Sequence, residues 1–489
     1  MEILGERLSQ RVVRLTLWVA AAAALVAIAA AQTLFAYSTN FVAALLAPAA
    51  LAVVVAVALR PMVGVYLGIL AIPLERLDLR FGGEIGLSPA EGMLLLAAGI
   101  AATRFFAEGG LRHLHPTQTA FGCLLLVMAT GLTFAGETLI VMKIGMMWSA
   151  FLILTFVVAR AGREQLRRML ICLSISGGIL GVVAMMASGD QSLVAGGRAV
   201  TNRAEAGFAH PAVLAFFLVL TIAPALALAI QSRPRVGVAM LICGGLATAG
   251  LLLSLTRGAI IGAVVSLIVM LAWPRFRRLA FGLLAITVVF AAFNLKALEQ
   301  SKQLEVIGTR LSTVTETRAT SENQRVRIWA AVPGMVAERP LLGTGAGNFG
   351  PVSQARGLIG PDGTGFYHAH NVLLTIVAEL GLVGLAFFLW FLFEIARTAG
   401  GLLRDRFSAD YPMAIALTAA LIGLFANSMT DYPPGTNVIA AVMMLHIGAL
   451  LALERLRNTE ESAPPHDEPA VAERPSPGDA RSRAEGAPS

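Results

Sequence analysis

The chain has 489 residues, of which 57% are hydrophobic and only 14% charged, and its formal net charge is +7. A soluble domain carries about 25% charged residues, so this composition excludes an ordinary soluble protein. Long apolar runs recur along nearly the whole length, and in lipid such runs must form helices that satisfy their own backbone. We predict an all-α polytopic membrane protein. The excess of Lys and Arg is typical of cytoplasmic loops, so nucleic acid is not an expected partner.

The hydropathy pattern predicts a transmembrane bundle of about fourteen spans, with a range of about 12–14. The first run follows three arginines and is long enough to span, so we interpret it as a retained helix and not a cleaved signal. All three cysteines lie inside apolar runs, and no disulfide framework is expected. The predicted spans lie near 15–36, 41–59, 61–74, 88–106, 117–135, 138–158, 169–188, 207–230, 236–255, 257–273, 279–296, 370–394, 411–428 and 436–453.

Charge in the connections predicts the orientation of these spans. The connections near 159–168 and 397–406 are rich in arginine, whereas those near 136–137 and 429–435 contain no Lys or Arg. Such alternation follows the positive-inside rule. It predicts that both termini are cytoplasmic and that the long segment before residue 370 lies outside.

The chain divides into four predicted segments. An N-terminal transmembrane bundle covers 1–296, an outer loop 297–369, the C-terminal transmembrane helices 370–456, and a cytoplasmic tail 457–489. The loop is longer than an ordinary connection, and apolar residues at helical spacing over 322–338 predict that it is partly helical. The tail is rich in Pro, Ser, Ala, Glu and Arg without apolar periodicity, so it is predicted to be disordered.

His370 stands where the outer loop meets an apolar helix, and Asn371 is expected to cap that helix. The partial positive charge of a helix N-terminus disfavours imidazolium, and a neutral histidine is suited to act as a general base. A histidine that only bonds a loop carbonyl is the alternative. Gly381 and Gly384, further along this helix, are interpreted as residues for close helix packing.

Arginines on the same side indicate an anionic ligand. Arg257 opens a span at the outer face, and Arg325 and Arg327 lie in the outer loop. Guanidinium groups bind phosphate through paired hydrogen bonds, so a lipid diphosphate is the expected ligand. The alternatives are a snorkelling anchor for Arg257 and a solvated helix face for the other two. Arg203 is a weaker candidate for the same pocket.

His368 and Glu379 are further candidates for proton transfer, although Glu379 could equally pair with an arginine. The glycine-rich stretch 343–350 resembles a phosphate-binding loop, but no Lys-Ser/Thr follows it, so nucleotide binding is not expected. No acidic motif with metal-ligand spacing occurs on the outer side. Neither a metal nor another cofactor is therefore expected.

Several of these pieces together resemble the bacterial O-antigen ligase and polymerase superfamily of integral membrane glycosyltransferases. The resemblance covers about residues 245–395, and its histidine pattern fits the ligase branch. The matching pieces are Thr256-Arg257-Gly258, Arg325 four residues before Trp329, Pro340-Leu-Leu-Gly-Thr-Gly with Asn348-Phe349, and His370-Asn371 followed after nine residues by Gly381-x-x-Gly384.

Three further observations bear on this resemblance. Arg339 and Gly350 fit an arginine-x10-glycine pattern of the polymerase branch. The stretch Gly207-Phe-Ala-His210-Pro211 departs from the Gly-x-x-x-Pro-Asn pattern of related chains. The predicted number of spans also exceeds the twelve usual for lipopolysaccharide ligases.

The resemblance implies a GT-C-like glycosyltransferase of the bacterial inner membrane, acting in lipopolysaccharide biosynthesis. Its partners would be an undecaprenyl-diphosphate-linked glycan donor, a lipid or glycan acceptor such as lipid A–core, and membrane lipids. The implied reaction is an inverting, metal-independent transfer at the periplasmic face. His370 would deprotonate the acceptor hydroxyl, and Arg257 and Arg325 would bind the diphosphate. A polysaccharide polymerase of the same superfamily and a polysaccharide or lipid transporter are the alternatives, and a transporter would predict inverted repeats and broken helices.

Overall fold

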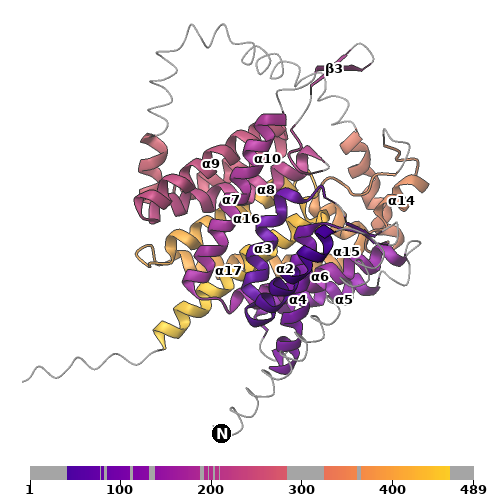
Figure 1. Ribbon diagram of the computed structural model, residues 1–489. Helices are drawn as coiled ribbons and strands as arrows, with labels where there is room; N and C mark the ends of the chain where they lie inside the picture. The colour runs from indigo at the N-terminus through magenta and orange to yellow at the C-terminus, as the bar shows by residue number, and fades with distance from the viewer. Residues whose placement is uncertain are drawn as a thin grey trace, which may run out of the picture.

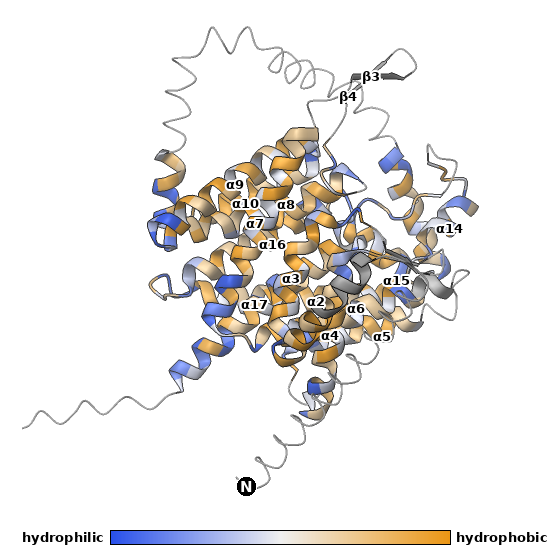
Figure 2. Cartoon of the chain, in the orientation of Figure 1, coloured by the Kyte–Doolittle hydropathy of each residue, from blue (hydrophilic) through white to orange (hydrophobic). Residues whose placement is uncertain are grey.

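The computed structural model describes residues 41–77, 79–81, 85–110, 114–130, 138–187, 192–195, 198–201, 204–208, 210–282, 324–360 and 365–462. These residues form a bundle of apolar helices with polar connections at its ends (Figures 1 and 2). The predicted span 15–36, most of the span 279–296 and Arg203 lie outside the described residues.

The helices follow the predicted spans to within a few residues at most ends. In the described part of the chain, eight helices are long and apolar enough to cross a membrane, and further apolar helices are shorter. This confirms the all-α polytopic fold class. The apolar helices are α2 (Phe41–Leu59), α3 (Pro61–Ala71), α4 (Pro89–Ala107), α5 (Pro116–Thr130), α6 (Thr138–Ala159), α7 (Arg163–Ala187), α8 (Pro211–Gln231), α9 (Pro234–Ser254), α10 (Arg257–Met270), α15 (Val372–Leu403), α16 (Tyr411–Ser428) and α17 (Asn437–Glu461).

Proline sets many of the helix starts. The helices α3, α4, α5, α8 and α9 each begin at a proline, whose fixed φ suits the first helical position and whose missing N–H is not needed there. At α4 the preceding Ser88 also forms a reciprocal capping box with Glu91. At the other end of the bundle, α17 continues to Glu461, past the predicted start of the tail at 457.

Short elements complete the described fold. Two antiparallel hairpins, which the sequence analysis did not predict, pair strands too short to show a period-two pattern. A helix over residues 324–338, here called the loop helix, confirms that the outer loop is partly helical. The remaining elements are η1 (Ile72–Leu74), β1 (Leu79–Phe81), β2 (Ile85–Leu87), β3 (Ser192–Ala195), β4 (Arg198–Thr201), α14 (Phe349–Ala355) and η4 (Pro433–Gly435).

The centre of the bundle is formed by α8 and α17. In the 18-residue apolar stretch of each helix, 78% of α8 and 83% of α17 is buried inside the protein. Glycines bring the neighbouring helices close to one another. A Cβ at Gly181 of α7 would collide with the backbone of α9 at Leu246, and a Cβ at Gly262 of α10 would collide with the backbone of α16 at Gly423. Small residues at such crossings are typical of helix packing in membranes.

The arginine-rich connections gather at one face of the bundle, here called the arginine face. Arg163 at the start of α7 forms an ion pair with Asp410 before α16, with Nε and Oδ1 2.7 Å apart. Arg455 near the end of α17 donates to the carbonyl oxygen of Ala161 after α6, at 3.0 Å. The start of α15 and the connection between α16 and α17 therefore lie at the opposite face, here called the site face.

Candidate active site

The turn that carries His370, residues 366–371, is held in place by the loop helix. Trp329 of that helix donates its indole N–H to the carbonyl oxygen of Ala369 at 2.8 Å. The backbone N–H of Ala369 in turn donates to Thr375 Oγ1 at 3.1 Å. His370 itself has a φ of +52°, which is uncommon for a residue other than glycine. The structure therefore positions this histidine through contacts from two separate helices.

Asn371 is the N-cap of α15, as predicted. Its side-chain oxygen accepts from the backbone N–H of Leu374 at 3.1 Å. Its amide nitrogen donates to the carbonyl oxygen of Met429 at 3.1 Å. Asn371 therefore joins the start of α15 to the end of α16, and its polar atoms are used within the protein.

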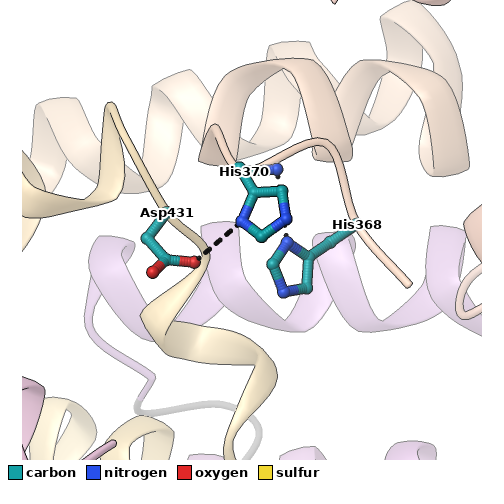
Figure 3. A group of neighbouring side chains, drawn as sticks. All are labelled: His368, His370 and Asp431. Carbon is teal, nitrogen blue, oxygen red and sulfur yellow. Dashed lines mark hydrogen bonds and ion pairs between the residues drawn. The ribbon is translucent and has the colours of Figure 1, made fainter. Parts of the chain in front are cut away.

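Asp431, which the sequence analysis did not single out, faces His370. It lies between α16 and α17, and its Oδ1 is 3.3 Å from Nδ1 of the histidine (Figure 3). The same oxygen accepts the backbone N–H of Tyr432 at 2.9 Å. One signal could have revealed it: a lone acid in a short outer connection that contains no Lys or Arg.

The pair is half-buried, which strengthens its electrostatic coupling. Burial by itself would raise the pKa of Asp431, but the hydrogen bond with His370 and the charges of His370 and His368 outweigh it and hold that pKa below its usual value. Asp431 is therefore ionised at neutral pH. An ionised carboxylate at Nδ1 favours the tautomer that carries its proton there, so the Nε2 lone pair of His370 is available as a base.

His368 lies beside this pair, and its ring centroid is 4.4 Å from that of His370. Its Nδ1 accepts the backbone N–H of His370 at 3.2 Å. Burial above all, together with the charges of His370 and Arg325 and against the opposing charge of Asp431, lowers the pKa of His368 to about 4. His368 is therefore neutral at physiological pH.

Arg325 acts on His368 through its charge, and Arg257 begins a helix that packs near the turn of Asp431. The charge of Arg325 reaches His368, and the loop helix presents Arg325 four residues before Trp329, on the same helix face. Arg257 opens α10 after Leu255, which has a left-handed φ of 53°. A Cβ at Gly258 would collide with Thr430, so the start of α10 packs against the turn that carries Asp431.

Arg327 is separated from this group. It is exposed on the loop helix two residues after Arg325, which places it on a different side of that helix. Within the part of the chain that the structure describes, the side chains of Arg257 and Arg325 make no ion pair or hydrogen bond with another residue. The site face thus carries two histidines, one carboxylate and two guanidinium groups that have no side-chain partner among the described residues.

Glu379 is buried in α15, and its carboxylate accepts the backbone N–H of Phe349 at 3.3 Å. The alternative of a pair with an arginine is not observed among the described residues. Glu379 lies just before Gly381, whose φ of 66° and ψ of −166° interrupt the helix. At a helix break, some backbone N–H and C=O groups lose their hydrogen-bond partners within the helix. When they are buried, these groups need other partners.

A turn rich in glycine, residues 340–348 and here called the glycine turn, fills this break. The N–H of Thr344 donates to the carbonyl of Ala378 at 2.9 Å, and the N–H of Leu382 donates to the carbonyl of Pro340 at 2.8 Å. A Cβ at Gly381 would collide with the backbone of Leu341. The close packing predicted for Gly381 is therefore against the glycine turn and not against another helix.

An apolar cavity of about 730 Å³ opens beneath His368 and Tyr432. It runs along α15 between α5, α6, α16 and α17 and reaches Leu403 near the arginine face. Aromatic side chains form much of its wall, while Glu379 and Thr418 are among its few polar residues. Such a lining suits a hydrocarbon chain with a polar head at the site face. The aromatic wall residues include Phe121, Trp148, Phe388 and Phe391.

Comparison with known proteins adds one informative match. Residues 239–389 match the family model described as O-antigen ligase. No curated protein matches the chain. A chain in a solved structure, described as "Structural coordination of polymerization and crosslinking by a peptidoglycan synthase complex", is similar with a TM-score of 0.38 and 15% identity, over 69% of this chain and 97% of that chain. The family match includes Arg257, Arg325 and His370 and ends before Asp431.

Proposed function

We propose that the chain transfers a glycan from undecaprenyl diphosphate to an acceptor hydroxyl, since residues 239–389 match the family model of O-antigen ligases. The observation that carries the proposal is the pair of His370 and Asp431, 3.3 Å apart and adjacent to His368 and Tyr432, which line the apolar cavity. Such a pair, at a face that also carries the guanidinium groups of Arg257 and Arg325, is suited to a reaction that deprotonates a hydroxyl and releases an anion.

His370 acts as the general base in this proposal. Asp431 accepts a hydrogen bond from the protonated Nδ1 of the ring. The unprotonated Nε2 then takes the proton of the acceptor hydroxyl. The acceptor oxygen then forms a bond to the anomeric carbon of the donor sugar while the bond from that carbon to the diphosphate oxygen breaks. The diphosphate leaves with the electron pair, and the configuration at carbon inverts. The ionised Asp431 stabilises the imidazolium that forms.

Arg257 and Arg325 bind the diphosphate. The leaving group gains negative charge as its bond to the sugar breaks, and guanidinium groups already in place stabilise that charge. Arg257 is the first residue of α10, where the helix dipole is also positive. The apolar cavity receives the polyprenyl chain, so the head of the donor is held at the site face.

A ligase and a polymerase share this geometry and differ in the acceptor. We propose the ligase, on the histidine pattern, with a polymerase as the alternative. The transporter alternative predicts a broken helix, and α15 is broken at Gly381. However, the open backbone groups at this break bind the glycine turn, so they support a structural role and not an ion site.

One experiment tests the function and separates the alternatives. The purified protein is incubated with an undecaprenyl-diphosphate-linked glycan and either lipid A–core or a second lipid-linked repeat unit. Transfer to lipid A–core supports a ligase, and a ladder of products on the lipid-linked repeat supports a polymerase. Absence of any glycosyl transfer, together with movement of the donor across a liposome membrane, would support the transporter.

The proposed orientation places the site face in the periplasm and both termini in the cytoplasm of the inner membrane. Clustering of the arginine-rich connections at the arginine face supports this orientation. Single cysteines introduced at Gly435 and at Phe407 can be tested with a membrane-impermeant thiol reagent in intact cells. Labelling at Gly435 alone is expected, and labelling at Phe407 alone would reverse the orientation.

A further inference from the structure

The side chains of His368, His370 and Asp431 form a cluster with the composition of a metal site. Each offers one ligand atom, and these atoms all lie within 4.8 Å of one another (Figure 3). The two histidines come from the turn before α15, and Asp431 comes from the connection after α16, 61 residues beyond His370. Sequence spacing predicts no metal motif here because the third ligand is contributed from a distant part of the chain.

We propose that this cluster binds a divalent transition-metal ion of the zinc class, and that the bound ion inhibits the enzyme. Two imidazoles and one carboxylate are the donor set that zinc takes in sites with an open fourth position. Calcium and magnesium prefer oxygen ligands, so a set with two ring nitrogens selects against them. All three residues of the cluster are only half-buried, and His368 also lines the apolar cavity, so an ion can reach the cluster from solvent.

The distances fit a four-coordinate ion after a small adjustment. With zinc–ligand bonds of about 2.0–2.1 Å in a tetrahedron, two ligand atoms lie about 3.3 Å apart. Nδ1 of His370 and Oδ1 of Asp431 are 3.3 Å apart. The largest separation in the cluster is no more than 4.8 Å. The difference between 4.8 and 3.3 is about 1.5 Å, which side-chain rotations can provide.

The surrounding charges favour nitrogen coordination over binding by charge alone. The ionised Asp431 attracts a cation, whereas the charge of Arg325 repels one. Because these two charges partly cancel, an ion that binds mainly by Coulomb attraction would bind weakly here. An ion that forms coordination bonds to imidazole nitrogens can still bind. Zinc must replace the hydrogen between His370 and Asp431, so binding releases one proton to solvent.

Inhibition follows from the identity of one ligand. The ion would occupy Nδ1 of His370 and separate it from Asp431, which removes the carboxylate that orients the base. This second part rests on the proposed function, whereas metal binding itself does not.

Metal binding is tested directly on the full-length protein in lipid nanodiscs. Titration with ZnCl₂ by calorimetry is expected to show one ion per chain, and CoCl₂ is expected to give the visible absorption bands of tetrahedral cobalt. His368→Ala and Asp431→Asn are each expected to weaken zinc binding at least about tenfold. The matched control is His115→Ala, which alters a histidine–carboxylate pair at the arginine face. Size-exclusion profiles check folding, and His368→Gln replaces the alanine variant if that one aggregates.

The outcomes separate this inference from the proposed function. Zinc affinity that is unchanged in both ligand variants, or no zinc uptake at all, overturns the metal site whatever the transfer assay shows. Glycan transfer that zinc inhibits and EDTA restores supports the inhibitory role. Transfer that persists with zinc bound, or that EDTA abolishes, overturns inhibition. If zinc binds as expected but no glycosyl transfer is ever detected, the metal site stands and the proposed function fails.

Discussion

The arginines of the two faces have different partners. At the arginine face, Arg163 binds both Asp410 and Glu460, and Arg455 donates to the carbonyl oxygens of Ala159 and Ala161. At the site face, Arg257 and Arg325 have no carboxylate or carbonyl partner among the described residues. Arg163 and Arg455 are therefore held by partners within the protein, whereas the side chains of Arg257 and Arg325 are not held by any described residue.

The histidine–carboxylate pairs show the same contrast. His115 and Glu454 are 3.1 Å apart at the arginine face, where Glu454 also accepts from Thr398. His370 and Asp431 are 3.3 Å apart at the site face, next to His368 and Tyr432, which line the apolar cavity. The His115–Glu454 pair lines a hollow of about 850 Å³ whose walls also include Arg397, Arg455 and Asn458, whereas the His370–Asp431 pair lies next to residues that line an apolar cavity. A similar pair therefore has charged and polar surroundings at one face and apolar surroundings at the other. This difference indicates that surroundings, more than residue type, decide which polar groups serve a ligand.

The largest expected effect is on transfer by the histidine at the site face. His370→Ala is expected to lower kcat about 10²–10⁴-fold, because loss of a general base typically costs two to four orders of magnitude. His115→Ala is expected to leave kcat within about twofold, since that histidine lies at the other face. Initial rates of glycan transfer measure both. Equal losses in the two variants would contradict the assignment of the base and the contrast between the faces.

Next in size is the effect of filling the helix break. Gly381→Ala is expected to destabilise the protein by roughly 3 kcal/mol or more, because an L side chain is strained at a φ of 66° and its Cβ would collide with Leu341. Gly400→Ala in the same helix is the control, as a Cβ there meets nothing within 4 Å. Thermal unfolding in detergent measures both. A Gly381→Ala protein as stable as the wild type would show that the break is not required.

Substitution of arginines is expected to change stability at one face and substrate affinity at the other. Arg163→Ala leaves the buried Asp410 without its cation and should destabilise the protein by roughly 2–4 kcal/mol, with little change in KM. Arg257→Ala and Arg325→Ala should each raise KM for the donor about 10–100-fold, as expected for hydrogen bonds to a charged group, with little change in melting temperature. Melting curves and steady-state kinetics on all three variants would show this crossover. Parallel losses of stability and affinity in every variant would remove the distinction.

Most of the fold could be predicted from the sequence, because lipid requires helices wherever a long apolar run occurs. The hydropathy pattern located α8, α9 and α16 closely, and the pattern of arginines indicated which connections share a face. The β hairpins were not predicted, since three or four residues are too few to show a period. The break in α15 was also missed, because Gly381 follows an unbroken apolar pattern and only the packing of the glycine turn requires its unusual φ.

The candidate site could be predicted only in part. The residues His370, Arg257 and Arg325 stand in local motifs, so each could be identified before its neighbours were known. Asp431 belongs to no such motif, and only the folding of α16 against α10 and α15 brings it to His370. Arg327 shows the reverse case, since it shares a motif with Arg325 but lies on another side of the loop helix.

The smallest expected effect is a pH dependence of stability that arises at the site face. Burial lowers the pKa of His368 to about 4 in the folded protein, from an ordinary value of 6.5. As the pH falls from 6.5 towards 4, the unfolded chain binds a proton at this histidine while the folded protein does not. The free energy of unfolding is therefore expected to decrease as the pH is lowered through this window. Above pH 6.5 this histidine makes no pH-dependent contribution to stability.

His368→Gln removes the titrating group while keeping a polar side chain of similar reach. Its melting temperature between pH 7 and pH 4.5 is expected to decline less steeply than that of the wild type. The carboxylate nearby acts in a lower window, because the pKa of Asp431 is held below its usual value and its contribution is lost only as the pH falls through that value. Identical slopes for the variant and the wild type would show that His368 is not buried in the neutral form. The cluster at the site face would then be more open to water than its packing against His370 and Tyr432 implies.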